Sequence, residues 1–180
     1  MLPNMTVICP ADYEQTRQAT LAIANYEGPV YLRFGRPKLP VFYKTDAPFE
    51  IGKAQKLMSG DDVTIIATGY MVWEAIKAAQ ILKEKGINAD VINMHTIKPL
   101  DADAILESAA RTGKVVTAEE HQRLGGLGCS VSQVLAEHNP TPMRMVAVED
   151  SFGESGTPTQ LMDKYSLNAD AIVSKALEIL

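Results

Sequence analysis

Short apolar runs alternate with longer amphipathic segments over most of this chain. The apolar runs are rich in valine, isoleucine and alanine and are bounded by glycine or polar residues, which is typical of buried strands. We expect four such strands, at residues 63–67, 89–94, 114–118 and 144–148. The segments between them repeat apolar residues at helical spacing, which predicts helices at residues 71–85, 102–111 and 128–137, followed by two short C-terminal helices. Strands that alternate with helices predict a mostly parallel sheet covered on both faces, a three-layer α/β/α fold.

The N-terminal part has a less regular pattern. Residues 5–10 predict the end of a strand with almost nothing before it, so we expect that an upstream part of this unit lies outside the sequence. Asp12 is placed to cap a helix, and residues 29–34 predict a short buried strand. The proline-rich residues 35–48 predict a linker, and residues 49–58 predict an antiparallel edge strand of the main sheet.

Several helix ends carry recognisable capping residues. Gly86 directly follows the helix predicted at residues 71–85. Glycine is a common residue just after a helix C-terminus, because it adopts the left-handed conformation at low cost. Asp101 and Asn168 precede apolar helical segments as N-caps. Thr157 and Gln160 have the spacing of a capping box, with a proline at the first helical position between them.

Composition narrows the class of protein. No apolar run approaches the ~20 residues that span a bilayer, and the first residues lack the basic start and apolar run of a secretory signal. We therefore expect a cytoplasmic protein without membrane contact, in which Cys9 and Cys129 are reduced. The net charge of −5 and the scattered lysines and arginines argue against nucleic-acid binding.

The stretch EEHQRLGGLG offers a candidate anion site. Gly125, Gly126 and Gly128 lie where a strand turns into a helix, and the N-H groups of a helix N-terminus bind phosphates. Their spacing fits neither the dinucleotide-binding fingerprint nor the P-loop. A tight turn with a close backbone contact, at a subunit interface or within the chain, is the favoured alternative. The adjacent Glu119 and Glu120 point to opposite faces of a strand, so we expect one in solvent and one in an interface hydrogen bond.

Two further positions follow predicted strands. Thr68 and Gly69 form a second candidate anion turn at a carboxyl end of the sheet, where open α/β sheets place ligands, although a plain turn is the favoured interpretation. His95 follows the next predicted strand, and from this position we expect its side chain to face a crevice at the same edge of the sheet. Histidine and cysteine residues show no metal-binding spacing, so we expect no metal site.

Arg33 and Arg36 lie at the end of a predicted strand and just beyond it. A guanidinium that emerges from a sheet edge can bind a phosphate with two parallel hydrogen bonds. A solvated arginine or a salt bridge between domains is the alternative interpretation, and spacing alone leaves both open. The chain contains no G-x-S-x-G and no complete cofactor motif.

Six stretches in this order resemble the C-terminal part of transketolase. The first two, PNMTVICPADYEQTRQA and GPVYLRFGRP, resemble the end of that family's pyrimidine-binding domain. The other four resemble successive landmarks of its C-terminal domain: IATGYMVWEA, INMHTIKPLD, EEHQRLGGLG and FGESGTP. Their joint order and spacing cover essentially the whole chain. The most similar form is the split transketolase, in which separate chains carry the diphosphate-binding domain and the remaining two domains.

The resemblance implies three parts. Residues 1–36 are the end of an incomplete pyrimidine-binding domain, residues 37–48 are a linker, and residues 49–180 are the C-terminal domain. The resemblance places Arg36 at the position of the family's arginine that binds the phosphate of the sugar substrate. It gives less support to a phosphate-binding role for Arg33. No catalytic residue is expected within this chain.

The family transfers a two-carbon ketol unit between sugar phosphates through thiamine diphosphate anchored by Mg²⁺. The motif that binds magnesium and diphosphate is expected on another chain or upstream, so this chain alone is expected to bind no cofactor and to be inactive. Expected partners are an N-terminal diphosphate-binding chain and a second copy, contacted through the C-terminal domain. In this context GGLG is expected to be a packing and interface turn.

Other assignments share parts of the pattern. 1-Deoxyxylulose-5-phosphate synthase and the β subunit of 2-oxoacid dehydrogenases have the same architecture, and GRPKLP departs from the more polar segment of full-length transketolases. FGESGTP favours transketolase, and an arginine for a sugar phosphate argues against the dehydrogenase. A noncatalytic α/β interaction module remains compatible with residues 49–180. A dinucleotide-binding domain is less compatible with these residues, because the glycine fingerprint of such domains is missing.

Overall fold

A five-stranded sheet forms the centre of the structure, which is a computed structural model that describes residues 2–35, 39–43, 46 and 48–180. The strand order is β3-β5-β4-β7-β8. The strands are β3 (Gln55–Met58), β4 (Val63–Ala67), β5 (Ala89–Asn93), β7 (Val115–Gln122) and β8 (Met143–Val148). All neighbours pair parallel except β3, which runs antiparallel to β5 at one edge. The predicted class, a mostly parallel α/β sheet with an antiparallel edge strand, is confirmed.

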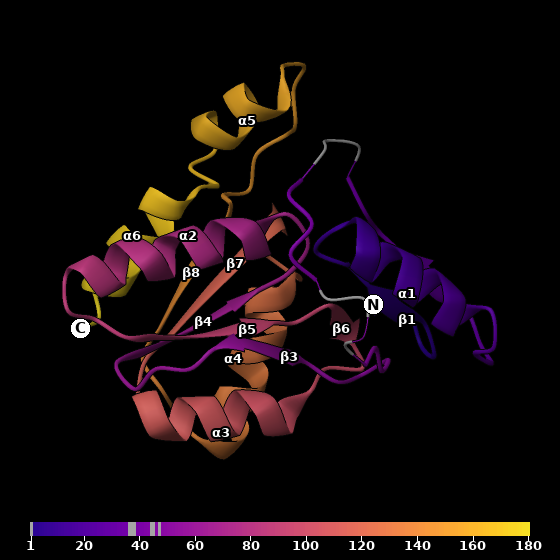
Figure 1. The fold of residues 1–180 in the computed structure, drawn as a ribbon, viewed down its shortest axis with the longest axis horizontal. Coiled ribbons are helices and arrows are strands. Elements are labelled where there is room, and N and C mark those ends of the chain that lie inside the picture. Colours follow the sequence, from indigo (N-terminus) through magenta and orange to yellow (C-terminus); the bar gives the residue numbers. More distant parts are fainter. Residues whose placement is uncertain (1, 36–38, 44–45, 47) are drawn as a thin grey trace.

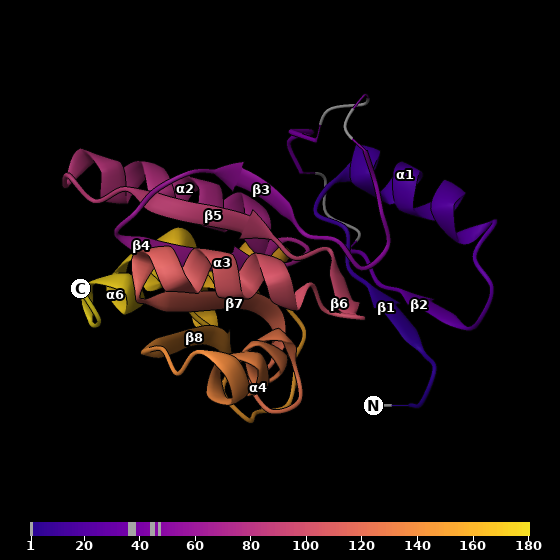
Figure 2. The ribbon, with the colours of Figure 1, turned by 90° about the horizontal axis from the view of Figure 1, so that it is seen from below.

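Helices cover both faces of this sheet, as Figures 1 and 2 show. Ile65 and Ile66 are neighbours on β4 and point to opposite faces. Ile65 belongs to the core under α2 and α6, and Ile66 to the core under α3 and α4. The helices after β3 are α2 (Met71–Glu84), α3 (Ala102–Thr112), α4 (Leu127–His138), α5 (Pro158–Lys164) and α6 (Ala169–Leu177).

The N-terminal residues form a second, smaller unit beside the main sheet (Figure 2). It contains β1 (Thr6–Ile8), α1 (Tyr13–Ile23) and β2 (Val30–Leu32). β1 pairs parallel with β2 and antiparallel with β6 (Thr96–Lys98), a strand that the sequence pattern does not predict. Because β6 follows β5 directly, it joins the small sheet to the body of the chain. The strand expected at 29–34 forms as β2, but the expectation that it is buried is wrong: Tyr31 is 54% exposed, because β2 is an edge strand of a three-stranded sheet.

The predicted caps hold the helix ends. Asp12, Asp101 and Asn168 each accept a hydrogen bond from the backbone N-H three residues later. At α5, Oε1 of Gln160 accepts from both the backbone N-H and the hydroxyl of Thr157. These helix starts were predictable because a cap depends on neighbours in the sequence.

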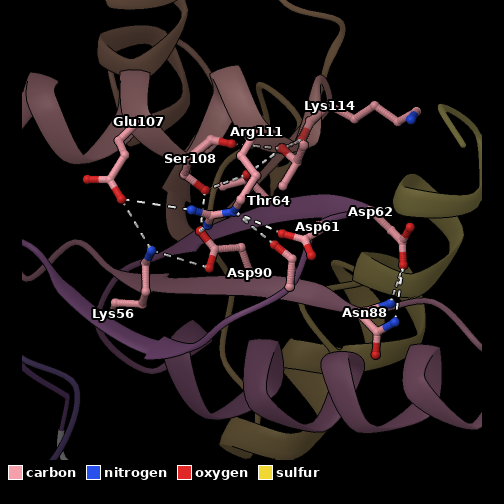
Figure 3. Close-up of polar contacts among 12 residues, drawn as sticks. Lys56, Asp61, Asp62, Thr64, Asn88, Asp90, Glu107, Ser108, Arg111 and Lys114 are labelled. Atoms are coloured by element: carbon pink, nitrogen blue, oxygen red, sulfur yellow. Dashed lines mark hydrogen bonds and ion pairs between the residues drawn. The ribbon is translucent and has the colours of Figure 1, made fainter.

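A buried polar network holds α3 against the amino ends of β4 and β5 (Figure 3). Asp90 is fully buried, and its carboxylate is 2.5 Å from the guanidinium of Arg111 and accepts a hydrogen bond from Ser108. The Thr64 hydroxyl lies 2.6 Å from that of Ser108 and 2.7 Å from that of Thr112. The network thus gives the buried carboxylate an ion-pair partner, as a buried charge requires.

Candidate functional site

A pocket of about 770 Å³ lies where the N-terminal unit meets the carboxyl ends of the main sheet. Its walls include Asp12 at the start of α1, Arg33 and Phe34 after β2, Tyr70 after β4, and Glu120 on β7. This edge of the sheet is where α/β folds place ligands. Among the described residues, its walls combine the guanidinium of Arg33 with carboxylates, tyrosines and apolar side chains, a mixture suited to a small polar ligand or to a partner surface.

Arg33 is one of the two arginines singled out from the sequence, and it lies in this pocket. Its backbone N-H donates to the carbonyl of Ile8 (2.8 Å), which extends the pairing of β1 and β2. Its guanidinium donates to the backbone carbonyl of Glu120, so the side chain links the N-terminal unit to β7. Arg36, the predicted phosphate-binding residue, lies outside the described residues.

The turn at Thr68 and Gly69 borders the same pocket. The N-H of Gly69 donates to the carbonyl of Cys9 (3.2 Å), and the N-H of Thr68 donates to the carbonyl of Ala118 (3.2 Å). Gly69 has a φ of +57°, and a Cβ there would lie 2.7 Å from Sγ of Cys9. The glycine therefore permits a close approach between the two units, which favours the interpretation of a turn over that of an anion site.

The GGLG segment binds a carboxylate of its own chain. Oε2 of Glu119 accepts a hydrogen bond from the N-H of Leu127 (2.7 Å), and Oε1 accepts from that of Gly128 (2.8 Å). A Cβ on Gly126 would stand 2.1 Å from Oε2 of Glu119. Glycine at 126 thus lets the helix N-terminus close over the carboxylate. This arrangement favours the close-contact interpretation of Gly125 and Gly126 over a phosphate cradle.

Glu119 and Glu120 do point to opposite sides of β7. Glu120 is exposed beside the pocket, and Glu119 is 1% exposed. We expected one of the two to make a hydrogen bond at an interface. Instead, Glu119 accepts two hydrogen bonds within the chain. Burial raises the pKa of the Glu119 carboxyl, and the N-H groups of Gly128 and Leu127 offset part of this effect.

His95 is a core residue and does not face the crevice expected from its position. It is 3% exposed, its ring stacks on that of Phe49 at 4.4 Å, and its Nδ1 lies 3.0 Å from Oγ1 of Thr96. Burial lowers the pKa of His95 to about 4, and the nearby Asp101 carboxylate offsets part of that shift. The side chain lies inside because β6 follows directly and pairs with β1 above it.

The sequence pattern missed the pocket residues Tyr13 and Thr16, and it did not connect Tyr70 or Glu120 with a pocket. A partial signal existed, since the first turn of a capped helix and the ends of parallel strands often line ligand sites. Within the described ranges, no cluster of three His, Cys, Asp or Glu side chains is arranged to hold a metal ion. In the same part of the chain, no helix has the length and apolar character needed to cross a bilayer.

Comparison with known proteins establishes the family. Residues 52–172 match the family model described as "Transketolase, C-terminal domain". The chain therefore belongs to the transketolase C-terminal domain family, which confirms the resemblance drawn from the six sequence stretches.

The similarity to individual proteins extends over nearly the whole chain. A solved structure titled "Split gene transketolase, inactive beta4 tetramer" superposes with a TM-score of 0.97 at 47% identity, covering 100% of this chain and 59% of that one. "6-deoxy-6-sulfo-D-fructose transketolase subunit SqwH" of Clostridium sp. (strain MSTE9) is 46% identical over 99% of this chain and 55% of its own length. One subunit of the apulose-4-phosphate transketolase of Phocaeicola vulgatus is 41% identical over 98% of this chain and 56% of its own length. The chain thus spans little more than half the length of these proteins.

Proposed function

We propose that this chain is the C-terminal portion of a thiamine diphosphate-dependent transketolase that transfers a two-carbon ketol unit between sugar phosphates. The observation that carries this proposal is the similarity of the whole chain to a split transketolase. Two relatives are named as transketolase subunits, which supports a second, diphosphate-binding chain as the partner. The related tetramer supports contact between copies of this chain. We assign that contact to the C-terminal domain, residues 49–180. A cytoplasmic role in sugar-phosphate metabolism fits this assignment.

The substrate names of the relatives support an anion-binding role for this chain. One name specifies a sulfo sugar and the other a sugar phosphate, so both substrates carry a tetrahedral oxyanion. An arginine fork binds such groups bidentately. We assign this role to Arg36, which follows the pocket residues Phe34 and Gly35 in the sequence, with Arg33 as a secondary contact.

In this proposal, the present chain and its diphosphate-binding partner have different roles in the reaction. Thiamine diphosphate, anchored by Mg²⁺ on the partner, supplies the group that carries the two-carbon unit. Residues 1–36 are the end of a pyrimidine-binding domain, and residues 37–48 link it to the C-terminal domain. This chain binds and orients the anionic end of the sugar. Neither chain is active alone.

The decisive test is ketol transfer between sugar phosphates, with thiamine diphosphate and Mg²⁺, for the complete protein mixed with its diphosphate-binding partner. Activity is expected only in the mixture. Carbon-carbon bond formation from pyruvate and glyceraldehyde phosphate, without ketol transfer, would move the assignment to 1-deoxyxylulose-5-phosphate synthase. Neither reaction in the mixture would leave a noncatalytic interaction module as the better description.

A further inference from the structure

Residues 149–164 form an arm that follows the carboxyl end of β8 and carries α5. In Figure 1 the chain around α5 stands clear of the main sheet and of the helices that cover it. Every residue from 149 to 160 is exposed, and Met162 is the buried residue of α5. The arm therefore contributes little to the core of its own domain.

Phe152 lies in this arm with its ring in solvent. It is 98% exposed, yet the backbone on both sides of it is held. Nε2 of Gln122 donates to the carbonyl of Ser151 (2.6 Å), and the Tyr165 hydroxyl lies 3.0 Å from the carbonyl oxygen of Phe152. The same hydroxyl lies 2.9 Å from Oε1 of Glu154. An aromatic ring that is presented on an ordered backbone is suited to anchor a partner, because little order has to be gained on binding.

The base of the arm adjoins the pocket between the N-terminal unit and the main sheet. Glu120 on β7 lines this pocket, and Gln122, two residues further along the strand, binds Ser151. The guanidinium of the next residue, Arg123, lies 2.8 Å from the carboxylate of Glu149. Pocket and arm therefore share the carboxyl edge of the main sheet, and a protein that docks over the pocket lies beside the arm.

The arm is also acidic. Residues 149–164 contain four carboxylates and one lysine. The whole chain has a net charge of −5, so a second copy would bring more negative charge to this surface. A chain that presents basic side chains around an apolar pocket would complement both the charge of the arm and the ring of Phe152. Charge therefore favours a different chain as the occupant.

From these contacts we infer that the arm is a docking surface for the diphosphate-binding chain, with the ring of Phe152 as its apolar anchor. This inference rests on the proposed function, which places thiamine diphosphate on that chain and the anionic end of the sugar on this one. Cofactor and sugar have to meet at the pocket, so the partner covers the edge from which the arm projects. On the partner, an apolar pocket flanked by lysines or arginines receives the ring.

Phe152→Ser removes the anchor and leaves the backbone contacts of the arm in place. The probe is the diphosphate-binding chain that supports ketol transfer when mixed with the complete protein, and calorimetric titration measures the Kd between the two. We expect Phe152→Ser to raise this Kd at least about tenfold, as the loss of an interface hot spot does. Urea unfolding of the variant should match that of the parent, since the ring is solvent-exposed.

Leu180→Ser is the matched control. Leu180 is an apolar residue that is 46% exposed, and Figures 1 and 2 show the C-terminus on the side of the main sheet away from the N-terminal unit. We expect its substitution to leave the Kd within about twofold of the parent value. Equal increases in Kd for the two variants would show a general effect of lost apolar surface and overturn the inference.

A kinetic titration separates assembly from chemistry. In Phe152→Ser, the partner concentration that gives half-maximal ketol transfer should rise with the Kd, and kcat at saturating partner should stay within about twofold of the parent. A lower kcat at saturating partner, with an unchanged Kd, would place the arm in the reaction and overturn its docking role.

The acidic character of the arm has its own test. Asp150 has a left-handed φ of +36°, a conformation that asparagine also adopts, so Asp150→Asn removes one charge and keeps the shape. We expect association with the partner to slow about two- to fivefold at low ionic strength, and the difference to shrink as salt is added. An unchanged association rate at low ionic strength would contradict a basic partner surface at the arm.

The remaining outcomes distinguish this inference from the proposed function. An unchanged Kd in Phe152→Ser, with an active wild-type mixture, would overturn the docking role and leave the proposed function standing. Loss of self-association of this chain in Phe152→Ser, with an unchanged Kd for the partner, would assign the arm to a second copy instead. A wild-type chain that neither binds the partner nor transfers ketol units would refute the proposed function, and the inference with it.

Discussion

The backbone N-H of Gly128 lies 2.8 Å from Oε1 of Glu119, so a buried carboxylate of β7 caps the helix that follows the glycine-rich turn. The second oxygen does the same for Leu127. The acceptor at this helix N-terminus is therefore a carboxyl group of the chain itself. The glycines are needed because a side chain at residue 126 would collide with the carboxylate.

Gly126→Ala is expected to destabilise the fold by about 2 kcal/mol or more, because the new Cβ overlaps a buried carboxylate that has little room to move. Urea unfolding measures this change. Gly153→Ala is the control, since a Cβ there meets nothing within 4 Å, and we expect it to stay within about 0.5 kcal/mol of the parent. Similar effects of the two substitutions would contradict the proposed packing around Glu119.

Arg111→Met is expected to cost roughly 3 kcal/mol of unfolding free energy, because it removes the nearer ion-pair partner of the fully buried Asp90 and leaves Lys56, whose Nζ is 3.8 Å from the carboxylate. Arg144→Met removes an arginine from an ion pair with Glu178 in which both side chains are substantially exposed. That control is expected to cost less than about 1 kcal/mol. Equal costs in denaturant unfolding would show that the network under α3 contributes no more than a surface pair.

Stability should fall between pH 6.5 and about 4 because of His95. Its folded pKa is lowered from 6.5 to about 4, so the neutral form stabilises the fold above pH 6.5 and this contribution is lost as the pH falls towards 4. The full effect is about 3 kcal/mol, from roughly 1.36 kcal/mol per pKa unit.

A comparison of the parent with His95→Gln isolates this effect, since every other titrating group is shared. The difference in unfolding free energy between the two proteins, measured by urea titration at several pH values, should shrink as the pH falls from 7 to 4. A constant difference would mean that His95 does not titrate with a lowered pKa.

Arg36→Ala in the assembled enzyme is expected to raise the KM for phosphorylated sugars roughly 10- to 100-fold, which is the size of a lost charge-assisted interaction. The KM for unphosphorylated analogues should change far less. Arg144→Ala, an arginine paired with Glu178 away from the pocket, is expected to leave both values unchanged. An equal increase in KM for both kinds of sugar in Arg36→Ala would contradict the phosphate-binding role of Arg36.

The elements that were predicted correctly depend on neighbours along the chain. The strands β4, β5, β7 and β8 were visible as short apolar runs, and the caps Asp101 and Asn168 act on residues three positions away. β6 was missed because three residues carry no period, and its strand conformation comes from pairing with β1.

The candidate site was predictable only in part. Arg33 was singled out by its place at the end of a predicted strand, and it does line the pocket between the N-terminal unit and the main sheet. His95 was expected at a crevice, but pairing of the strand that follows it closes that space. The sequence did not reveal that two capping carboxylates also bind distant N-H groups. Asp12 accepts from the N-H groups of Phe42 and Tyr43, and Asp101 accepts from that of Ala54. Spacing along the chain predicts only the nearby cap.

By itself, the sequence determined the fold class, the order of the helices and of the strands other than β6, the helix starts and the family, because periodicity, capping and ordered motifs are local properties of the chain. Tertiary structure alone decided which polar groups meet: Glu119 with the turn before α4, Asp90 with Arg111, and Asp12 with residues 42–43. The physical reason is that these contacts join segments far apart in sequence, and their partners are selected by how the packed sheets and helices bring buried donors and acceptors together.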